Sequence, residues 1–324
     1  MRIKAFSSLF KTFVLAGLLG LGSAWASGPM RAPLPVVTSF SILADVTQQI
    51  GGERVAVQPL IAADTDAHSY QMTPADVRKI RSAKLLIANG LGLESAPLQR
   101  AMQGSQIPLA VATQGIEPLP THEHDHDHGH AHEHSHSHGH HHHAHGEHDP
   151  HVWQDPVRMQ AYARNIAQAL IQADPAGKPH YEQRLAAYQR ELQQLHSWAE
   201  QQFAAIAPAQ RKVLTAHDAF AYLGARYQVT FVAPLGVSAD SDASARRVAR
   251  LIQQVRTQGI RAIFLENVKD ARLIEQIARE TGVPVQQQAL YSDALSGPKG
   301  PAPTYLQLMR HNISALATAL KAKR

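Results

Sequence analysis

Histidine is the residue type in this chain whose number and placement point most directly to chemistry. The 324 residues include 21 His and no Cys, so any transition metal would be held by imidazole and carboxylate groups. Three histidines, His68, His151 and His217, lie at junctions between predicted strands and helices. Open α/β sheets bind ligands at the carboxyl ends of their strands. Any one of these residues could equally be structural, but three at similar positions favour a shared metal site.

Asp293 is the candidate for a fourth ligand. It follows the last predicted strand, at residues 283–286, and protein zinc sites favour four ligands drawn from His nitrogen and carboxylate oxygen. An ordinary Asp in a loop turn is the alternative interpretation. His180, His196 and His311 fall in predicted helices, and we expect them to be surface or packing residues.

Residues 121–150 hold histidine in a different arrangement, interleaved with Asp and Glu and without Lys or Arg. Almost nothing in this tract is apolar, so its composition predicts a disordered loop. Such a tract is typical of weak, multivalent metal contact, and a solvated, pH-sensitive spacer is the alternative. The candidate ligands of this secondary, low-affinity site are His122, His124, His126, His128, His130, His132, His134, His136, His138, His140, His141, His142, His143, His145 and His148.

Composition and motifs exclude several classes of function. Without Cys there are no disulfides, thiolate zinc sites or iron–sulfur clusters. The net charge of +5 falls to +2 once the three basic residues near the N-terminus are set aside, so we expect no nucleic-acid binding. The chain lacks the Gly-x-Ser-x-Gly, His-Glu-x-x-His and phosphate-loop motifs. We therefore predict that it is not an enzyme, with a three-histidine zinc hydrolase left open.

The first 26 residues resemble a cleavable secretory signal peptide. A basic start precedes an apolar stretch from Phe13 to about Leu21, and Ser-Ala-Trp-Ala at residues 23–26 supplies a small-x-small cleavage pattern. An uncleaved membrane anchor is the alternative, but the apolar stretch is shorter than the roughly 20 residues that a membrane span needs. We expect export to the periplasm and cleavage after Ala26.

The elements that must position the candidate ligands alternate between strand and helix. This pattern predicts an α/β protein of two lobes with largely parallel sheets, the first at 27–173 and the second at 208–324. A helical pattern over 174–207 predicts a long helix that links the lobes. A helix packed wholly within one lobe would show the same sequence pattern and is the alternative. The metal site is expected in the cleft between the lobes.

Several motifs resemble those of the zinc and manganese solute-binding proteins of ABC importers, the ZnuA-like family. The matching stretches lie at 66–70 with 74–76, 89–94, 149–156, 217–222 and 303–305, and they cover essentially the whole mature chain. The resemblance implies two lobes joined by a rigid helix, a metal buried between them, and delivery of that metal to a membrane permease.

The resemblance also implies roles for single residues. The three histidine ligands of the family fall on His68, His151 and His217, and manganese-selective members carry Glu at the third position, so His217 favours zinc. Some zinc members have Glu before the first histidine, where this chain has Ala67. That difference favours Asp293, which matches the Asp of manganese members and of the AztC-like zinc branch. The long histidine tract is more typical of ZnuA-like proteins.

Together these features predict a periplasmic, high-affinity zinc-binding protein that captures Zn²⁺ as cargo and delivers it to an ABC-type permease. We expect a monomer, with a periplasmic zinc chaperone as a possible further partner. A periplasmic zinc chaperone or buffer that serves no permease is the main alternative, followed by a manganese-binding importer component.

Overall fold

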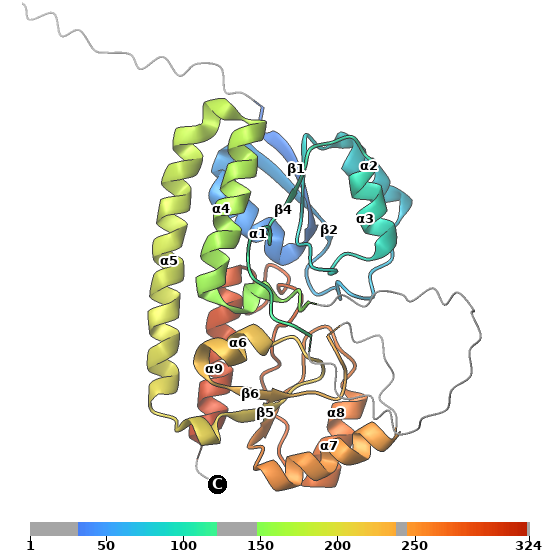
Figure 1. Ribbon diagram of the computed structural model, residues 1–324, viewed down its shortest axis with the longest axis vertical. Helices are drawn as coiled ribbons and strands as arrows, with labels where there is room; N and C mark the ends of the chain where they lie inside the picture. Colours follow the sequence, from blue (N-terminus) through green and yellow to red (C-terminus); the bar gives the residue numbers. More distant parts are fainter. Residues whose placement is uncertain (1–31, 122–147, 238–244, 323–324) are drawn as a thin grey trace, which may run out of the picture. The chain divides into compact units, whose positions relative to one another are not determined.

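The computed structural model describes residues 32–121, 148–237 and 245–322. The first half of this part contains a four-stranded parallel sheet of order β2-β1-β3-β4 (Figure 1). Its strands are β1 (Leu34–Phe40), β2 (Val55–Ile61), β3 (Leu85–Ala88) and β4 (Leu109–Val111). The helices of this half are α1 (Ser41–Gly51), α2 (Pro74–Ser82), α3 (Ala96–Gln103) and α4 (Pro156–Ala173). Every strand pair is parallel, as the alternation of apolar runs and amphipathic stretches predicts.

The second half contains a three-stranded parallel sheet of order β6-β5-β7. Its strands are β5 (Lys212–Leu214), β6 (Thr230–Val232) and β7 (Ala262–Ile263), and its helices are α6 (Ala221–Tyr227), α7 (Ala245–Gln258) and α8 (Arg272–Thr281). The predicted α/β class with parallel sheets is therefore confirmed. This half has a small apolar core of its own, to which β5, α7 and α8 contribute Leu214, Leu251 and Ile274.

One sequence-based expectation in this half is wrong. Residues 283–286 pattern as a strand, yet the described chain pairs there only at a single bridge between Ile263 and Val285. Pro284 has no backbone N–H to donate, so a regular ladder cannot form through it. Isolated backbone bonds, such as Gln286 N to Ile263 O, replace the ladder.

Helix α5 (Lys178–Ala204) is the longest helix of the described residues and runs beside both sheets (Figure 1). It packs against α1 and α4 of the first half and against α6 and α9 (Tyr305–Lys321) of the second. A 3-10 turn at Pro175–Gly177 precedes it, so the regular helix begins four residues after Asp174. Its apolar stripe is buried at Tyr181, Tyr188, Leu192 and Leu195.

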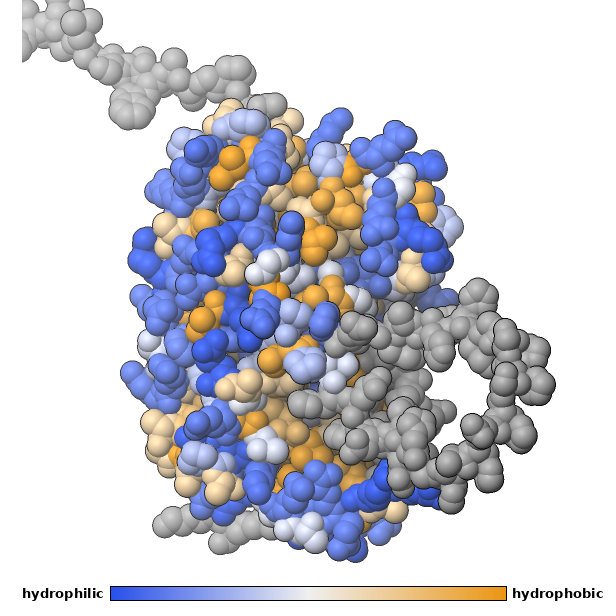
Figure 2. Space-filling view, in the orientation of Figure 1, coloured by the Kyte–Doolittle hydropathy of each residue, from blue (hydrophilic) through white to orange (hydrophobic). Residues whose placement is uncertain are grey.

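The face shown in Figure 2 is mainly hydrophilic, with hydrophobic residues scattered among the polar ones. Among the described residues, no helix combines the length and the apolar character that crossing a bilayer requires.

Arg211 joins the end of α5 to α6. Its guanidinium donates to the backbone carbonyls of Phe203, Ile206 and Tyr227 at 2.8, 2.9 and 2.7 Å, and the residue is only 8% exposed. Carbonyls at the end of a helix have no partner within the helix, so this side chain supplies what the backbone cannot.

We expect Arg211→Met to lower the free energy of unfolding by about 2–4 kcal/mol, because three buried carbonyls each lose one hydrogen bond. Urea denaturation followed by circular dichroism measures the change. Arg190→Met, at an exposed position of α5, is the matched control and should be close to neutral. Equal losses in the two variants would contradict this role of Arg211.

Candidate metal centre

The structure brings His68, His151, His217 and Asp293 together. One ligand atom from each residue lies within 4.8 Å of the other three. His68 lies between β2 and α2, His151 just before the 3-10 turn that leads into α4, and His217 between β5 and α6. Asp293 lies in the long connection between α8 and α9. Four segments far apart in the sequence thus converge on one point.

Three of the four donor-atom separations are close to the edges of a small coordination polyhedron. His68 Nε2 and His151 Nε2 lie 3.2 Å apart, and Asp293 Oδ1 lies 3.2 Å from His151 Nε2. Asp293 Oδ2 lies 3.2 Å from His217 Nε2 and 4.0 Å from His68 Nε2. Ligand atoms of a tetrahedral zinc ion, with bonds of about 2.0–2.1 Å, lie about 3.3 Å apart. The set therefore fits a single ion.

Glu266 positions His217 from behind. Its Oε1 accepts hydrogen bonds from the backbone N–H groups of Ala216 and His217, at 2.7 and 3.0 Å. Its Oε2 lies 2.6 Å from His217 Nδ1, so the opposite ring nitrogen, Nε2, is directed toward Asp293. A carboxylate behind a ligating histidine fixes the orientation of the ring and makes it a stronger donor.

Asp149 plays the corresponding role for His151. Its Oδ1 accepts from the backbone N–H of His151 at 2.9 Å and lies 2.6 Å from His151 Nδ1. The turn that follows then holds the Asp293 segment, because Trp153 Nε1 and Gln154 Nε2 both donate to Ser292 O, at 2.8 and 3.0 Å. Two of the four segments are thereby fixed to each other.

The His68 segment is held by a third carboxylate, that of Asp66. Asp66 Oδ1 accepts from the backbone N–H of His68 at 3.0 Å, and Asp66 Oδ2 lies 2.7 Å from Lys269 Nζ. The side chain of His68 is 5% exposed, whereas those of His151, His217 and Asp293 are fully buried. Of the four side chains, only that of His68 therefore retains any exposed surface among the described residues.

Burial and neighbouring carboxylates oppose each other at the histidines. Burial lowers the pKa of His68 well below its usual value. Burial also disfavours charge on His151, but Asp149 and Asp293 outweigh it and raise its pKa to about 9. At His217 burial is likewise outweighed by Glu266 and Asp293, which raise the pKa to about 10. At neutral pH the metal-free centre therefore holds protons on two of its imidazoles.

The carboxylate of Asp293 stays ionised in the same surroundings. Burial would raise its pKa, but the imidazoles of His217 and His151 hold it well below its ordinary value. The centre thus offers an anionic oxygen beside three ring nitrogens.

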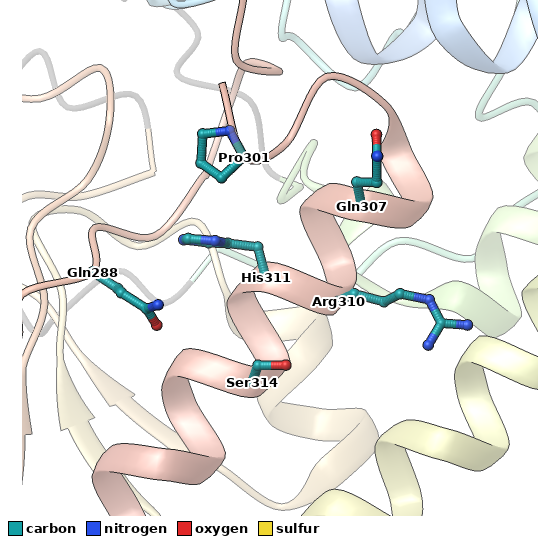
Figure 3. Close-up of a pocket in the computed structure, with 6 residues that line it drawn as sticks. All are labelled: Gln288, Pro301, Gln307, Arg310, His311 and Ser314. Atoms are coloured by element: carbon teal, nitrogen blue, oxygen red, sulfur yellow. The ribbon is translucent and has the colours of Figure 1, made fainter. Parts of the chain in front are cut away.

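The other histidines lie elsewhere. His180 Nε2 is 3.0 Å from Gly51 O, and His196 Nδ1 is 3.1 Å from the hydroxyl of Tyr227. His311 lines the surface pocket of Figure 3, where its Nε2 lies 2.9 Å from Ala289 O. All three pack within the fold, as expected from their helical positions.

Most of the histidine tract lies outside the described residues. Residues 122–147 hold all of its histidines except His148, which is exposed and forms an isolated antiparallel bridge with Pro120. The prediction of a secondary, low-affinity metal site in this tract therefore stays a prediction.

Sequence reasoning missed three residues that surround the centre: Asp149, Glu266 and Lys269. Asp149 stands two residues before His151, a spacing at which a carboxylate can accept from the backbone of its neighbour. Glu266 follows the apolar run of residues 262–265, so its position at the end of a strand resembles that of His217. Nothing in the sequence around Lys269 distinguishes it from a surface lysine.

The comparisons with known proteins agree with this fold. The sequence profile of the family described as "Zinc-uptake complex component A periplasmic" matches residues 36–319. The chain belongs to this ZnuA-like family. The resemblance inferred from the sequence motifs is therefore confirmed.

ZnuA-like relatives match along nearly their whole length. The chain is 30% identical to the iron-binding protein YfeA of Yersinia pestis, over 97% of this chain and 93% of that protein. It is 26% identical to the manganese ABC transporter substrate-binding lipoprotein PsaA of Streptococcus pneumoniae, over 98% and 99% of the two chains. Both relatives are named as binding proteins, the second as part of an ABC transporter, which agrees with the prediction that this chain is not an enzyme.

Solved structures of the ZnuA-like type share the fold. The Mn-bound periplasmic metal binding protein of Candidatus Liberibacter asiaticus is 29% identical, with a TM-score of 0.75 over 89% of this chain and 99% of that one. The periplasmic zinc binding protein TroA of Treponema pallidum is 26% identical, with a TM-score of 0.78 over 90% and 100%. The two-lobe α/β fold is thus shared with metal-binding proteins of known structure.

We expect metal binding to release protons, because an ion that bonds to His151 and His217 must displace the protons that their raised pKa values retain at pH 7. Affinity should therefore fall as the pH falls. Titration calorimetry at pH 7 in buffers of different ionisation enthalpy measures the number of protons, for which we expect more than one per ion. Binding without proton release would contradict the protonation state derived above.

Glu266→Gln should weaken metal binding by about 10–100-fold, because the neutral amide no longer raises the donor strength of His217 or fixes its ring. A competition titration with a chelator of known affinity measures the loss. Glu275→Gln, at an exposed position on α8, is the matched control and should bind as the unaltered protein does. If both variants bound equally well, Glu266 would have no such role.

Proposed function

We propose that the protein captures Zn²⁺ as its cargo with His68, His151, His217 and Asp293. The observation that carries this proposal is the convergence of four donor groups, with one ligand atom from each within 4.8 Å of the others and three separations of 3.2 Å. Three neutral imidazoles and one carboxylate give a closed, four-coordinate set, which is the arrangement that zinc accepts most readily.

Zinc fits these donors better than manganese does. Imidazole suits zinc, copper, iron and nickel, whereas manganese prefers a larger number of oxygen ligands, water among them. Three of the four donors here are nitrogen, and the fully buried ring nitrogens leave little room for added water. The names of two relatives specify iron and manganese, so the choice of metal must be tested by competition.

Capture rather than catalysis follows from the fourth donor. A catalytic zinc site keeps one position open for water or substrate. Here Asp293 stands at that position, with both carboxylate oxygens turned toward histidine nitrogens. We therefore propose that no bond is made or broken at this centre and that a zinc hydrolase is not the function.

Delivery to an ABC-type membrane permease completes the proposed role. Family membership supports it, because the relatives include substrate-binding components of ABC transporters. We propose that the protein acts in the periplasm after loss of residues 1–26, which lie outside the described part of the chain. Growth at scarce zinc that requires both this protein and its permease would separate import from a free-standing zinc buffer.

His217→Ala, made in a variant that lacks residues 122–147, should lose the tight zinc site. The deletion removes nearly all histidines of the tract, so zinc that remains bound must be held elsewhere. Metal analysis after dialysis measures bound zinc, for which we expect one ion per chain before the substitution and none after it. Manganese should not displace the ion at equal concentration.

His311→Ala in the same deletion background is the matched control, since His311 lies in a separate surface pocket and should leave binding intact. Retention of one tightly held zinc by the His217→Ala protein would overturn the assignment of the ligands.

For the histidine tract we propose weak capture of zinc that supplies the tight site. Deletion of residues 122–147 should then slow zinc loading at scarce zinc while leaving the final occupancy unchanged. Stopped-flow loading at submicromolar zinc measures the rate. Equal loading rates with and without the tract would remove this role.

A further inference from the structure

A buried lysine lies directly beside the candidate centre. Lys269 lies on the segment between β7 and α8, and its side chain is only 5% exposed. Its Nζ lies 3.3 Å from Asp293 Oδ2 and 2.7 Å from Asp66 Oδ2. Asp293 Oδ2 is also the oxygen that lies 3.2 Å from His217 Nε2. The ammonium group therefore contacts the same oxygen that faces the imidazole donors.

A fixed positive charge at this position opposes a bound cation. A dication held by Asp293 and the imidazoles would sit within a few ångströms of the ammonium, in surroundings from which water is largely excluded. Repulsion between like charges is strongest where solvent screening is weakest. The ammonium also draws electron density from the carboxylate that the ion needs as a ligand.

Charge balance explains why a buried lysine is tolerated here. The side chains of Asp149, Glu266 and Asp293 are no more than 1% exposed, so these three carboxylates are withdrawn from bulk solvent. Asp66, 18% exposed, adds a fourth charge beside Lys269. Buried carboxylates need positive partners, and an ammonium supplies one whether or not a metal is bound.

We infer that Lys269 sets an upper limit on metal affinity by competing with the bound ion for Asp293, so that the ion can leave again. This inference rests on the proposed function, because it assumes that the four residues hold the cargo. In a protein that must hand its ion to a partner, a permanent competing charge shortens the time for which the ion stays bound.

A purely structural role for Lys269 makes the opposite prediction. Lys269 comes from the second half of the fold and Asp66 from the connection between β2 and α2, so their contact ties the His68 segment in place. If that tie were the whole role of Lys269, removing it would loosen His68 and speed the loss of metal.

The test compares the dissociation rate of zinc from the full chain and from Lys269 variants, measured by stopped flow against an excess of chelator. Lys269→Gln removes the charge while keeping a donor for Asp66, and Lys269→Met removes both. We expect zinc to leave at least tenfold more slowly from both variants. Lys269→Arg keeps the charge and should release zinc within about threefold of the unaltered rate.

The matched control is Lys79→Met on α2. Lys79 Nζ lies 3.6 Å from Asp76 Oδ1, an ion pair that involves none of the four candidate ligands. This variant should release zinc at the unaltered rate. Thermal melting of the metal-free variants verifies that each one is folded, and if Lys269→Met unfolds, Lys269→Gln carries the test.

The outcomes are distinguishable. Equal or faster release from Lys269→Gln, with tight zinc binding by the unaltered protein, overturns the inference and leaves the proposed function standing. Absence of tight zinc binding by the unaltered protein overturns both. Slower release from the uncharged variants together with unaltered release from Lys269→Arg supports the inference.

Discussion

The burial of carboxylates around three imidazoles is the constraint on which the centre depends. Asp149, Glu266 and Asp293 are withdrawn from water, and removing one charged group from water costs several kcal/mol unless an opposite charge compensates it. His151 lies between Asp149 and Asp293, and His217 lies between Glu266 and Asp293. Without a metal, protons on these rings balance the charges. A dication that replaces the protons satisfies the same carboxylates.

The fold serves this constraint by bringing four separate segments to one point and fixing them to one another. Trp153 and Gln154 hold the Asp293 segment through Ser292 O, while Lys269 reaches the His68 segment through Asp66. Helix α5 packs against helices from both halves and so connects the two parts of the fold. Because carboxylates hold the rings of His151 and His217, and hydrogen bonds to their backbones hold the segments of His68 and Asp293, little conformational entropy is lost when an ion binds.

Much of this arrangement could be predicted from the sequence. Apolar runs bounded by turns predicted the parallel strands. The positions of His68, His151 and His217 at strand–helix junctions predicted a shared metal site. The strand expected at 283–286 failed because Pro284 interrupts the ladder, an effect that apolar patterning does not register. The supporting residues were missed because Glu266 and Lys269 have roles only through contacts with segments distant in the sequence. The identity of the metal depends on ligand geometry, which no single sequence encodes directly.

The most direct test of the central claim is the X-ray absorption spectrum of zinc bound to the variant that lacks residues 122–147, because that spectrum reports the atoms around the ion itself. The account predicts about three nitrogen donors with the outer-shell pattern of imidazole and one carboxylate oxygen, all at about 2.0–2.2 Å, without a water ligand. Asp293→Asn should alter the oxygen shell and leave the imidazole shells in place. A six-coordinate, oxygen-dominated shell, or fewer than three imidazoles, would contradict the assignment of three histidines and Asp293 as the zinc ligands.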